Sequence, residues 1–271
     1  MAERADIFRT MMDVSSSSRK SRVVLALDLS TRLLQPEREK FRSELLEKAL
    51  SILKCTYPHL AAVKINHQLV LPLGLYDFIQ DIVREAKSHS LPLIMDCKAN
   101  DVEHTNRWIA RHYFDAGFDA LIANPFVGWE GGIEPIMSEA REQGKGVILL
   151  TYMSHPGAAE GYGQQVLAEK SKRPERQYLV FAHRAVEWGA DGVIAGATYP
   201  EKIREINQIT DGKVPIYSPG IGAQGGDVKE AMKAGCKYAI IGRAIFESED
   251  PSKSALEMKE KINMALKELN P

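Results

Sequence analysis

The sequence is poor in cysteine and contains no long hydrophobic run. Its three cysteines, Cys55, Cys97 and Cys236, are far apart and form no CxxC pair, so neither a disulfide framework nor a zinc knuckle is indicated. The longest apolar runs, such as Gly146–Leu150, have the length of a strand rather than of a membrane span. The first 22 residues lack the apolar core of a signal peptide. We therefore expect a soluble, cytoplasmic protein without a metal site.

An excess of either charge is also missing. The chain has 35 Lys and Arg against 36 Asp and Glu, a formal net charge of −1, so its charge predicts neither nucleic acid nor membrane as a partner. A small anionic substrate needs only a local positive site and is compatible with this balance. The 271 residues, 44% of them hydrophobic, fit either one α/β barrel or two smaller domains.

Short apolar segments rich in β-branched residues alternate with amphipathic stretches along the chain. The apolar segments are nearly continuous, which is typical of parallel strands covered on both faces. Eight such units without a linker predict a single-domain (β/α)₈ barrel over residues 23–271, with a doubly wound open sheet as the alternative. The expected strands are 23–29, 60–66, 91–98, 120–125, 146–153, 192–198, 215–222 and 238–246.

Three segments depart from this rhythm. Residues 1–22 are expected to form an N-terminal extension, with a short helix near Asp6–Met12 and a Ser-rich joint at Ser15–Ser18. A long loop, 154–177, follows the fifth strand, and the glycine-rich segment PGIGAQGGD, 219–227, follows the seventh. Loops that follow barrel strands lie at the carboxyl end of the barrel, where active sites occur, and a loop as long as the first is usually a lid or disordered.

Charged side chains stand at the ends of the first three expected strands. Asp96 and Lys98 are two residues apart in a strand and therefore face the same side, and Asp101 follows on the loop. Asp28 and Lys64 hold the matching places on the first two strands. A buried lone charge is costly, so these groups are expected to pair, and a lysine flanked by carboxylates stays protonated. The pattern predicts a fixed proton donor beside negative charge; a structural ion-pair network is the alternative.

The end of the barrel sequence indicates an anion site. Segment 219–227 lacks P-loop spacing but is expected to expose backbone N–H groups at a turn that leads into a helix. Arg243, directly after Gly242, can hold a phosphate with two hydrogen bonds. Loops after the seventh and eighth strands commonly bind phosphate in such barrels. The alternative is that these glycines only permit tight turns.

Five motifs in this order resemble those of the orotidine 5′-phosphate decarboxylases, most closely the compact prokaryotic and archaeal type. They are VKINHQL, MDCKANDVEHT, MSHPGA, PGIGAQGGD and GRAIF, within residues 23–246. The DxKxxD element alone is shared with related sugar-phosphate decarboxylases, whereas MSHPGA followed by PGIGAQGGD is more specific. The resemblance implies a homodimer that converts orotidine 5′-phosphate to uridine 5′-phosphate and CO₂ without a cofactor.

The resemblance also implies a catalytic set. Lys98 would donate the proton, and Asp96 would lie against the substrate carboxylate. Lys64 would complete the alternating charges and touch the ribose. Asp101 would reach into the partner subunit's site, assisted by Thr105. The family often has proline two residues after this last aspartate, whereas Glu103 stands at that position here. This departure affects the expected path of the loop and the assignment of Thr105. His104 is interpreted as an incidental loop residue.

The remaining implied residues bind the substrate. Asp28 would hold the ribose, Ser154 would contact the pyrimidine edge, and Gln224 would bridge the base and the phosphate. The others line the base and phosphate end: Pro219, Gly220, Gly222, Gly225, Gly242 and Arg243.

Two other functions stay open from the sequence. A metal-dependent decarboxylase of the 3-keto-gulonate-6-phosphate type on the same barrel would need a magnesium shell of oxygen ligands. A non-catalytic barrel that binds a phosphate ligand would predict a disrupted Lys/Asp set, whereas the set in this sequence is intact.

Overall fold

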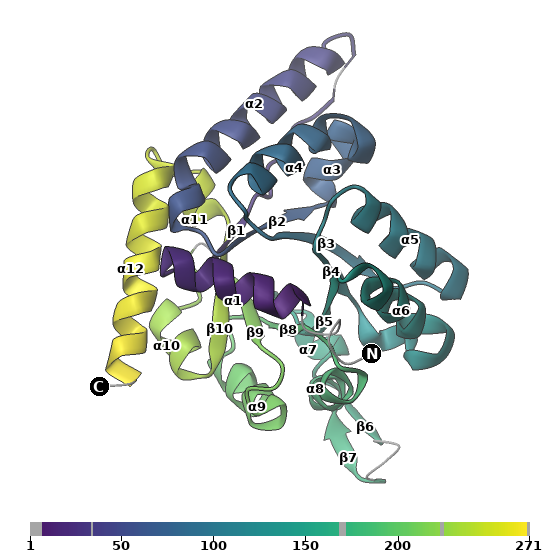
Figure 1. The fold of residues 1–271 in the computed structure, drawn as a ribbon. Coiled ribbons are helices and arrows are strands. Elements are labelled where there is room, and N and C mark those ends of the chain that lie inside the picture. Colours follow the sequence, from purple (N-terminus) through teal and green to yellow (C-terminus); the bar gives the residue numbers. More distant parts are fainter. Residues whose placement is uncertain (1–6, 34, 168–171, 223–224, 270–271) are drawn as a thin grey trace.

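Eight parallel strands close into a barrel (Figure 1). The computed structural model describes residues 7–33, 35–167, 172–222 and 225–269. Strand β1 pairs with both β2 and β10, which closes the sheet and rules out the open alternative, so the predicted single-domain (β/α)₈ barrel is confirmed. Around the barrel the strands are β1 (Val23–Ala26), β10 (Cys236–Ile241), β9 (Ile216–Pro219), β8 (Gly192–Ala195), β5 (Gly146–Tyr152), β4 (Ala120–Ala123), β3 (Leu93–Ala99) and β2 (Ala62–Asn66).

Helices cover the outside of the barrel. Within the described ranges, none of them has both the length and the apolar content needed to cross a bilayer. The α-helices are α1 (Ile7–Arg19), α2 (Arg38–Thr56), α3 (His67–Leu73), α4 (Ile79–Ser88), α5 (Glu103–Asp115), α6 (Glu134–Gln143), α7 (Ala158–Gly161), α8 (Gln177–Trp188), α9 (Pro200–Thr210), α10 (Val228–Lys233), α11 (Arg243–Phe246) and α12 (Pro251–Leu269). Shorter helical turns are η1 (Tyr57–His59), η2 (Gly74–Phe78), η3 (Pro125–Val127) and η4 (Trp129–Ile133).

The barrel strands are buried on both faces, which explains their continuous apolar sequence. Every residue of β5 is buried, as is every residue of β1, β4 and β8. Several strands are shorter than the apolar segments that predicted them. Strand β1 ends at Ala26, so Asp28 lies just beyond the sheet rather than within it.

Helix α1 packs across the amino-terminal end of the barrel, in front of the strands in Figure 1. The helix continues through Ser15–Ser18, so the predicted joint there is wrong. Ser15 is buried and its hydroxyl donates to the Ala61 carbonyl (2.6 Å), which lets a polar residue occupy the packed helix face. Phe8 and Met12 are buried in the same core as the strands. The division of the chain into an N-terminal extension, 1–22, and a barrel domain, 23–271, stays a prediction.

Much of the expected loop after β5 has regular structure. Helix α7 is followed by an antiparallel pair, β6 (Gln165–Leu167) and β7 (Pro174–Arg176), which projects from the body of the barrel (Figure 1). The Gln177 N–H donates to the Gln164 carbonyl (2.9 Å) and closes the base of this hairpin before α8 begins. The hairpin is tied by backbone hydrogen bonds and is not a free loop.

Candidate active site

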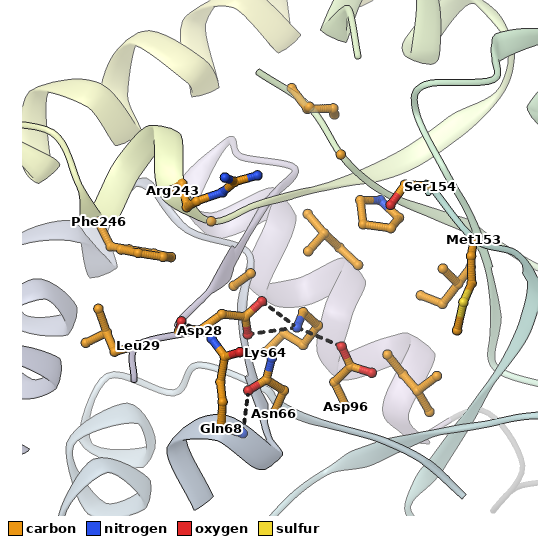
Figure 2. Close-up of a pocket in the computed structure, with 18 of the residues that line it drawn as sticks. Asp28, Leu29, Lys64, Asn66, Gln68, Asp96, Met153, Ser154, Arg243 and Phe246 are labelled. Carbon is orange, nitrogen blue, oxygen red and sulfur yellow. Dashed lines mark hydrogen bonds and ion pairs between the residues drawn. The ribbon is translucent and has the colours of Figure 1, made fainter. Parts of the chain in front are cut away.

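A pocket of about 620 Å³ opens at the carboxyl ends of the barrel strands. All eight barrel strands contribute residues to its lining, as in the active sites of such barrels. Figure 2 shows Asp28, Lys64 and Asp96 on its floor, with Ser154 and Arg243 above them. The residues predicted from strand ends in different parts of the sequence therefore meet in one cavity.

The floor of the pocket carries alternating charges. The Lys64 ammonium donates to Asp28 Oδ1 (3.0 Å) and to Asp96 Oδ2 (2.8 Å), drawn as dashed lines in Figure 2. The Lys98 ammonium donates to the other oxygen of Asp96, Oδ1, at 2.6 Å. The order is Asp28, Lys64, Asp96, Lys98, with each inner group held from both sides. The strand positions predicted that these four groups would meet, but they did not specify the order of the pairs.

Burial and pairing act against each other in this array. The side chain of Lys64 is only 4% exposed, and burial alone would lower its pKa, but the carboxylates of Asp96 and Asp28 outweigh this and raise it. For Asp96, burial alone would raise the pKa, whereas Lys64 and Lys98 together bring it below its ordinary value. Both groups are therefore charged at neutral pH.

Lys98 stands on a distorted piece of backbone. Its φ is +48°, in the left-handed region that side chains other than glycine rarely adopt, and the register between β3 and β4 shifts between Met95 and Ala99. Strained positions of this kind gather at functional sites. Cys97, which faces away from the pocket, donates weakly to the Ile122 carbonyl, and burial raises the pKa of its thiol to about 12, so it is not a nucleophile.

Asp101 and Thr105 do not join the pocket of their own chain. Both are exposed, and neither lines the cavity. The Asp101 carboxylate accepts from the Val102 N–H (2.7 Å), and the Asn106 amide donates to the Asp101 carbonyl (2.6 Å). These bonds fix the start of α5, with Asp101 facing solvent.

The glycine-rich loop differs from its expected conformation. Its N–H groups at Gly222, Gly225 and Gly226 donate to carbonyls within the loop itself, at 2.8–3.0 Å, so these three are not available to an anion. An anion site formed by segment 219–227 stays a prediction. Gly220, Gly222 and Gly225 have positive φ, which allows this tight turn. Gln224 lies outside the described residues.

The positive end of the pocket is provided by Arg243, on the first turn of α11. Its side chain projects into the cavity in Figure 2, and Gly242 before it also lines the cavity. Pro219 and Ser154 also line the cavity. The Thr198 hydroxyl donates to the Ser154 carbonyl (3.0 Å) and ties the end of β5 to the loop after β8.

Among the pocket residues that the sequence analysis did not predict are two polar ones, Asn66 and Gln68. Asn66 stands two residues after Lys64, so the alternation that grouped Asp96 with Lys98 also predicts it on the pocket side. Gln68 lies in the first turn of α3 and could not be placed by strand alternation.

Comparisons with known proteins agree with this geometry. A profile of the "Orotidine 5'-phosphate decarboxylase / HUMPS family" matches residues 21–258. The orotidine 5′-phosphate decarboxylase of Methanosarcina mazei is 35% identical over 249 residues, which are 92% of this chain and 98% of that protein. The one from Thermococcus kodakarensis is 37% identical over 244 residues, 90% of this chain and 97% of that protein.

Solved structures show the same likeness. The orotidine 5′-monophosphate decarboxylase of Methanocaldococcus jannaschii, crystallised with the inhibitor BMP, has a TM-score of 0.73 and 28% identity, and the match covers 90% of this chain and 99% of that one. The Pyrococcus horikoshii enzyme has a TM-score of 0.70 and 32% identity, covering 89% and 99%. Fold and site together define a (β/α)₈ barrel enzyme with a lysine–carboxylate centre. The chain belongs to the orotidine 5′-phosphate decarboxylase / HUMPS family.

Proposed function

We propose that the protein decarboxylates orotidine 5′-phosphate to uridine 5′-phosphate and CO₂. The observation that carries this proposal is the array Asp28, Lys64, Asp96, Lys98 at the floor of a pocket whose rim holds Arg243. The chain also matches nearly the whole length of relatives that are named orotidine 5′-phosphate decarboxylase.

The chemistry required by this reaction fits a fixed ammonium. The bond between C6 and the carboxylate carbon breaks, CO₂ leaves, and the electron pair stays on C6 in the plane of the ring, where the π system does not delocalise it. Stabilisation must then be electrostatic, from a cation already in place. Lys98 holds its ammonium by Asp96, so it can stabilise this carbanion and then transfer a proton to C6.

Asp96 has two roles in this scheme. It keeps Lys64 and Lys98 oriented, and its negative charge repels the substrate carboxylate until CO₂ departs. Two unit charges about 4 Å apart interact by about 4 kcal/mol at an effective dielectric constant near 20. Arg243 binds the phosphate at the other end, where binding energy remote from C6 helps to organise the site.

The two alternative functions receive less support. A metal-dependent decarboxylase would need oxygen ligands, but Asp28 and Asp96 are both paired with Lys64, so a divalent ion would compete with an ammonium already in place. A silent binding barrel would not need these buried charges, whose desolvation is costly and is offset only by their mutual pairing.

A homodimer in which Asp101 and Thr105 complete the partner's site is part of the proposal. Both residues are exposed and neither lines its own pocket, and the exposed apolar side chains of Tyr76, Val102 and Trp108 lie on α5 or next to it. The Tyr76 hydroxyl hydrogen-bonds to His112 Nδ1 (2.7 Å), which joins η2 to α5. Exposed apolar side chains that gather in one region are typical of protein interfaces. We also propose a cytoplasmic location, where a reducing environment keeps the three cysteines as the free thiols seen here.

One assay tests the function. Purified protein is mixed with orotidine 5′-phosphate, and the loss of its ultraviolet absorbance is followed before and after prolonged treatment with EDTA. We expect turnover that EDTA does not change. Absence of turnover contradicts the proposal, and activity that is lost to EDTA and restored by magnesium supports the metal-dependent alternative.

A further inference from the structure

The loop that carries Asp28 has few backbone restraints. The last backbone hydrogen bond between β1 and its neighbour runs from the Leu27 N–H to the Lys64 carbonyl (2.9 Å). From Asp28 to Pro36, the described residues of this loop make no further backbone–backbone hydrogen bond. Asp28 is therefore held mainly by side chains.

One of these side chains is Gln68. Its amide donates to the backbone carbonyl of Asp28, and Figure 2 shows the two side chains next to each other at the edge of the pocket. Gln68 is itself oriented by Asn66, whose side chain accepts from the Gln68 N–H (3.0 Å) and caps α3. The cap fixes the first turn of the helix, and that turn directs the Gln68 amide at Asp28.

Asp28 is thus held by hydrogen bonds at both its side chain and its backbone. Its carboxylate accepts from Lys64, while its carbonyl accepts from Gln68. The carboxylate bond alone leaves the backbone free to pivot about the side chain, since the strand has already ended. A second bond to the backbone removes this freedom, so the carboxylate keeps one position relative to Lys64.

We infer that Gln68 is a positioning residue: it fixes Asp28 so that this carboxylate can hold Lys64 and the substrate ribose together. The ribose contact rests on the proposed function. Gln68 acts here through Asp28 and not by touching the substrate.

The test compares Gln68→Met, which keeps the length of the side chain but removes its donor, with a matched control. Gln80 on α4 also donates its amide to backbone carbonyls, those of Leu75 (2.9 Å) and Ala116 (3.1 Å), but outside the pocket. We expect kcat/KM for orotidine 5′-phosphate to fall about threefold to tenfold in Gln68→Met, mainly through KM, the range that one hydrogen bond contributes. Gln80→Met should keep the unaltered kcat/KM.

A double-mutant cycle with Asp28→Asn separates positioning from direct contact. Asn keeps the backbone carbonyl that Gln68 binds but removes the carboxylate that Gln68 positions. If Gln68 acts through Asp28, adding Gln68→Met to Asp28→Asn should lower kcat/KM by less than about twofold. Full additivity of the two losses overturns the inference, because Gln68 would then act on the substrate independently.

Hydrogen exchange tests the same point without the reaction. In Gln68→Met, the backbone amide of Leu27, which donates to the Lys64 carbonyl, should exchange about threefold faster or more than in the unaltered protein, while Gln80→Met leaves it unchanged. Unchanged exchange at this amide in Gln68→Met overturns the inference. If the unaltered protein does not turn over orotidine 5′-phosphate, the proposed function fails, and the exchange measurement still decides the role of Gln68.

Discussion

Replacing Lys64 by methionine should damage stability and catalysis together. Met has a similar shape but no charge, so Lys64→Met leaves Asp96 held only by Lys98 and leaves Asp28 without its ammonium partner. Removing one member of a buried ion pair costs about 3–5 kcal/mol. The lower end applies here, because the Asp28 side chain is 28% exposed and can regain water. We expect the free energy of unfolding to fall by about 3 kcal/mol, which corresponds to a Tm about 5 °C lower.

The effect on turnover should be larger than the effect on stability. Without Lys64, Asp96 loses one of its two anchors, and a misplacement of about 1 Å near reacting groups can cost a hundredfold. Thermal unfolding and the orotidine 5′-phosphate absorbance assay, run on the same preparation, should show both losses. A folded Lys64→Met variant that is as stable as the unaltered protein and keeps its kcat/KM within twofold would refute the reasoning about the array.

Lys87→Met provides the control. Lys87 also pairs with a buried carboxylate, Asp119 (2.6 Å), but at the other end of the barrel strands from the pocket. Asp119 keeps two partners in this variant, the Lys145 ammonium (3.3 Å) and the Leu93 N–H (2.9 Å). The Tm should therefore fall by less than in Lys64→Met, and turnover should not change.

Four further outcomes are expected. Lys98→Ala should remove nearly all turnover while uridine 5′-phosphate still binds in calorimetry; substantial residual activity would contradict the proton-donor role. Arg243→Ala should lower kcat/KM for orotidine 5′-phosphate far more than for the nucleoside orotidine, and equal losses would mean that Arg243 supports the fold. The pKa of Asp96 is lowered in the folded state, so its stabilising contribution is present above the unfolded value of about 3.9 and is lost as pH falls through the lower folded value. Urea unfolding should therefore show a constant difference in stability between the unaltered protein and Asp96→Asn from pH 7 to about pH 5, and a smaller difference at more acidic pH. An equal mixture of Lys98→Ala and Asp101→Asn subunits, allowed to exchange, should recover about a quarter of the unaltered activity. Half of the dimers are then mixed, and one of the two sites in each mixed dimer is intact. No recovery after confirmed exchange would place Asp101 in its own chain's site.

The barrel and the charged floor were predictable because each depends on a simple periodicity. Continuous apolar segments specify strands covered on both faces, and two-residue spacing specifies which side chains share a face. That spacing brought Asp96 and Lys98 together correctly. It could not reveal that Lys98 takes a left-handed φ, because alternation assumes regular strand geometry.

Other features depend on contacts that a local pattern does not contain. The helix that includes Ser15 is specified partly by burial against the barrel end, not by the low helix propensity of a serine run. The orientation of the N–H groups at Gly222 and Gly225 depends on the sign of φ, which glycine leaves open. The proposed role of Asp101 depends on a second chain, so no single-chain pattern specifies it.

The left-handed backbone at Lys98 implies a conflict between the stability of the folded protein and the chemistry at this position. A side chain with a Cβ costs about 1–2 kcal/mol in this conformation, whereas glycine costs almost nothing and asparagine little. Lys98→Gly would relieve that strain, but it would also remove one of the two ammonium groups that pair with the buried Asp96 carboxylate. The backbone strain and the ion pair therefore act in opposite directions on the free energy of unfolding, and the ammonium is held at this position at the cost of that strain.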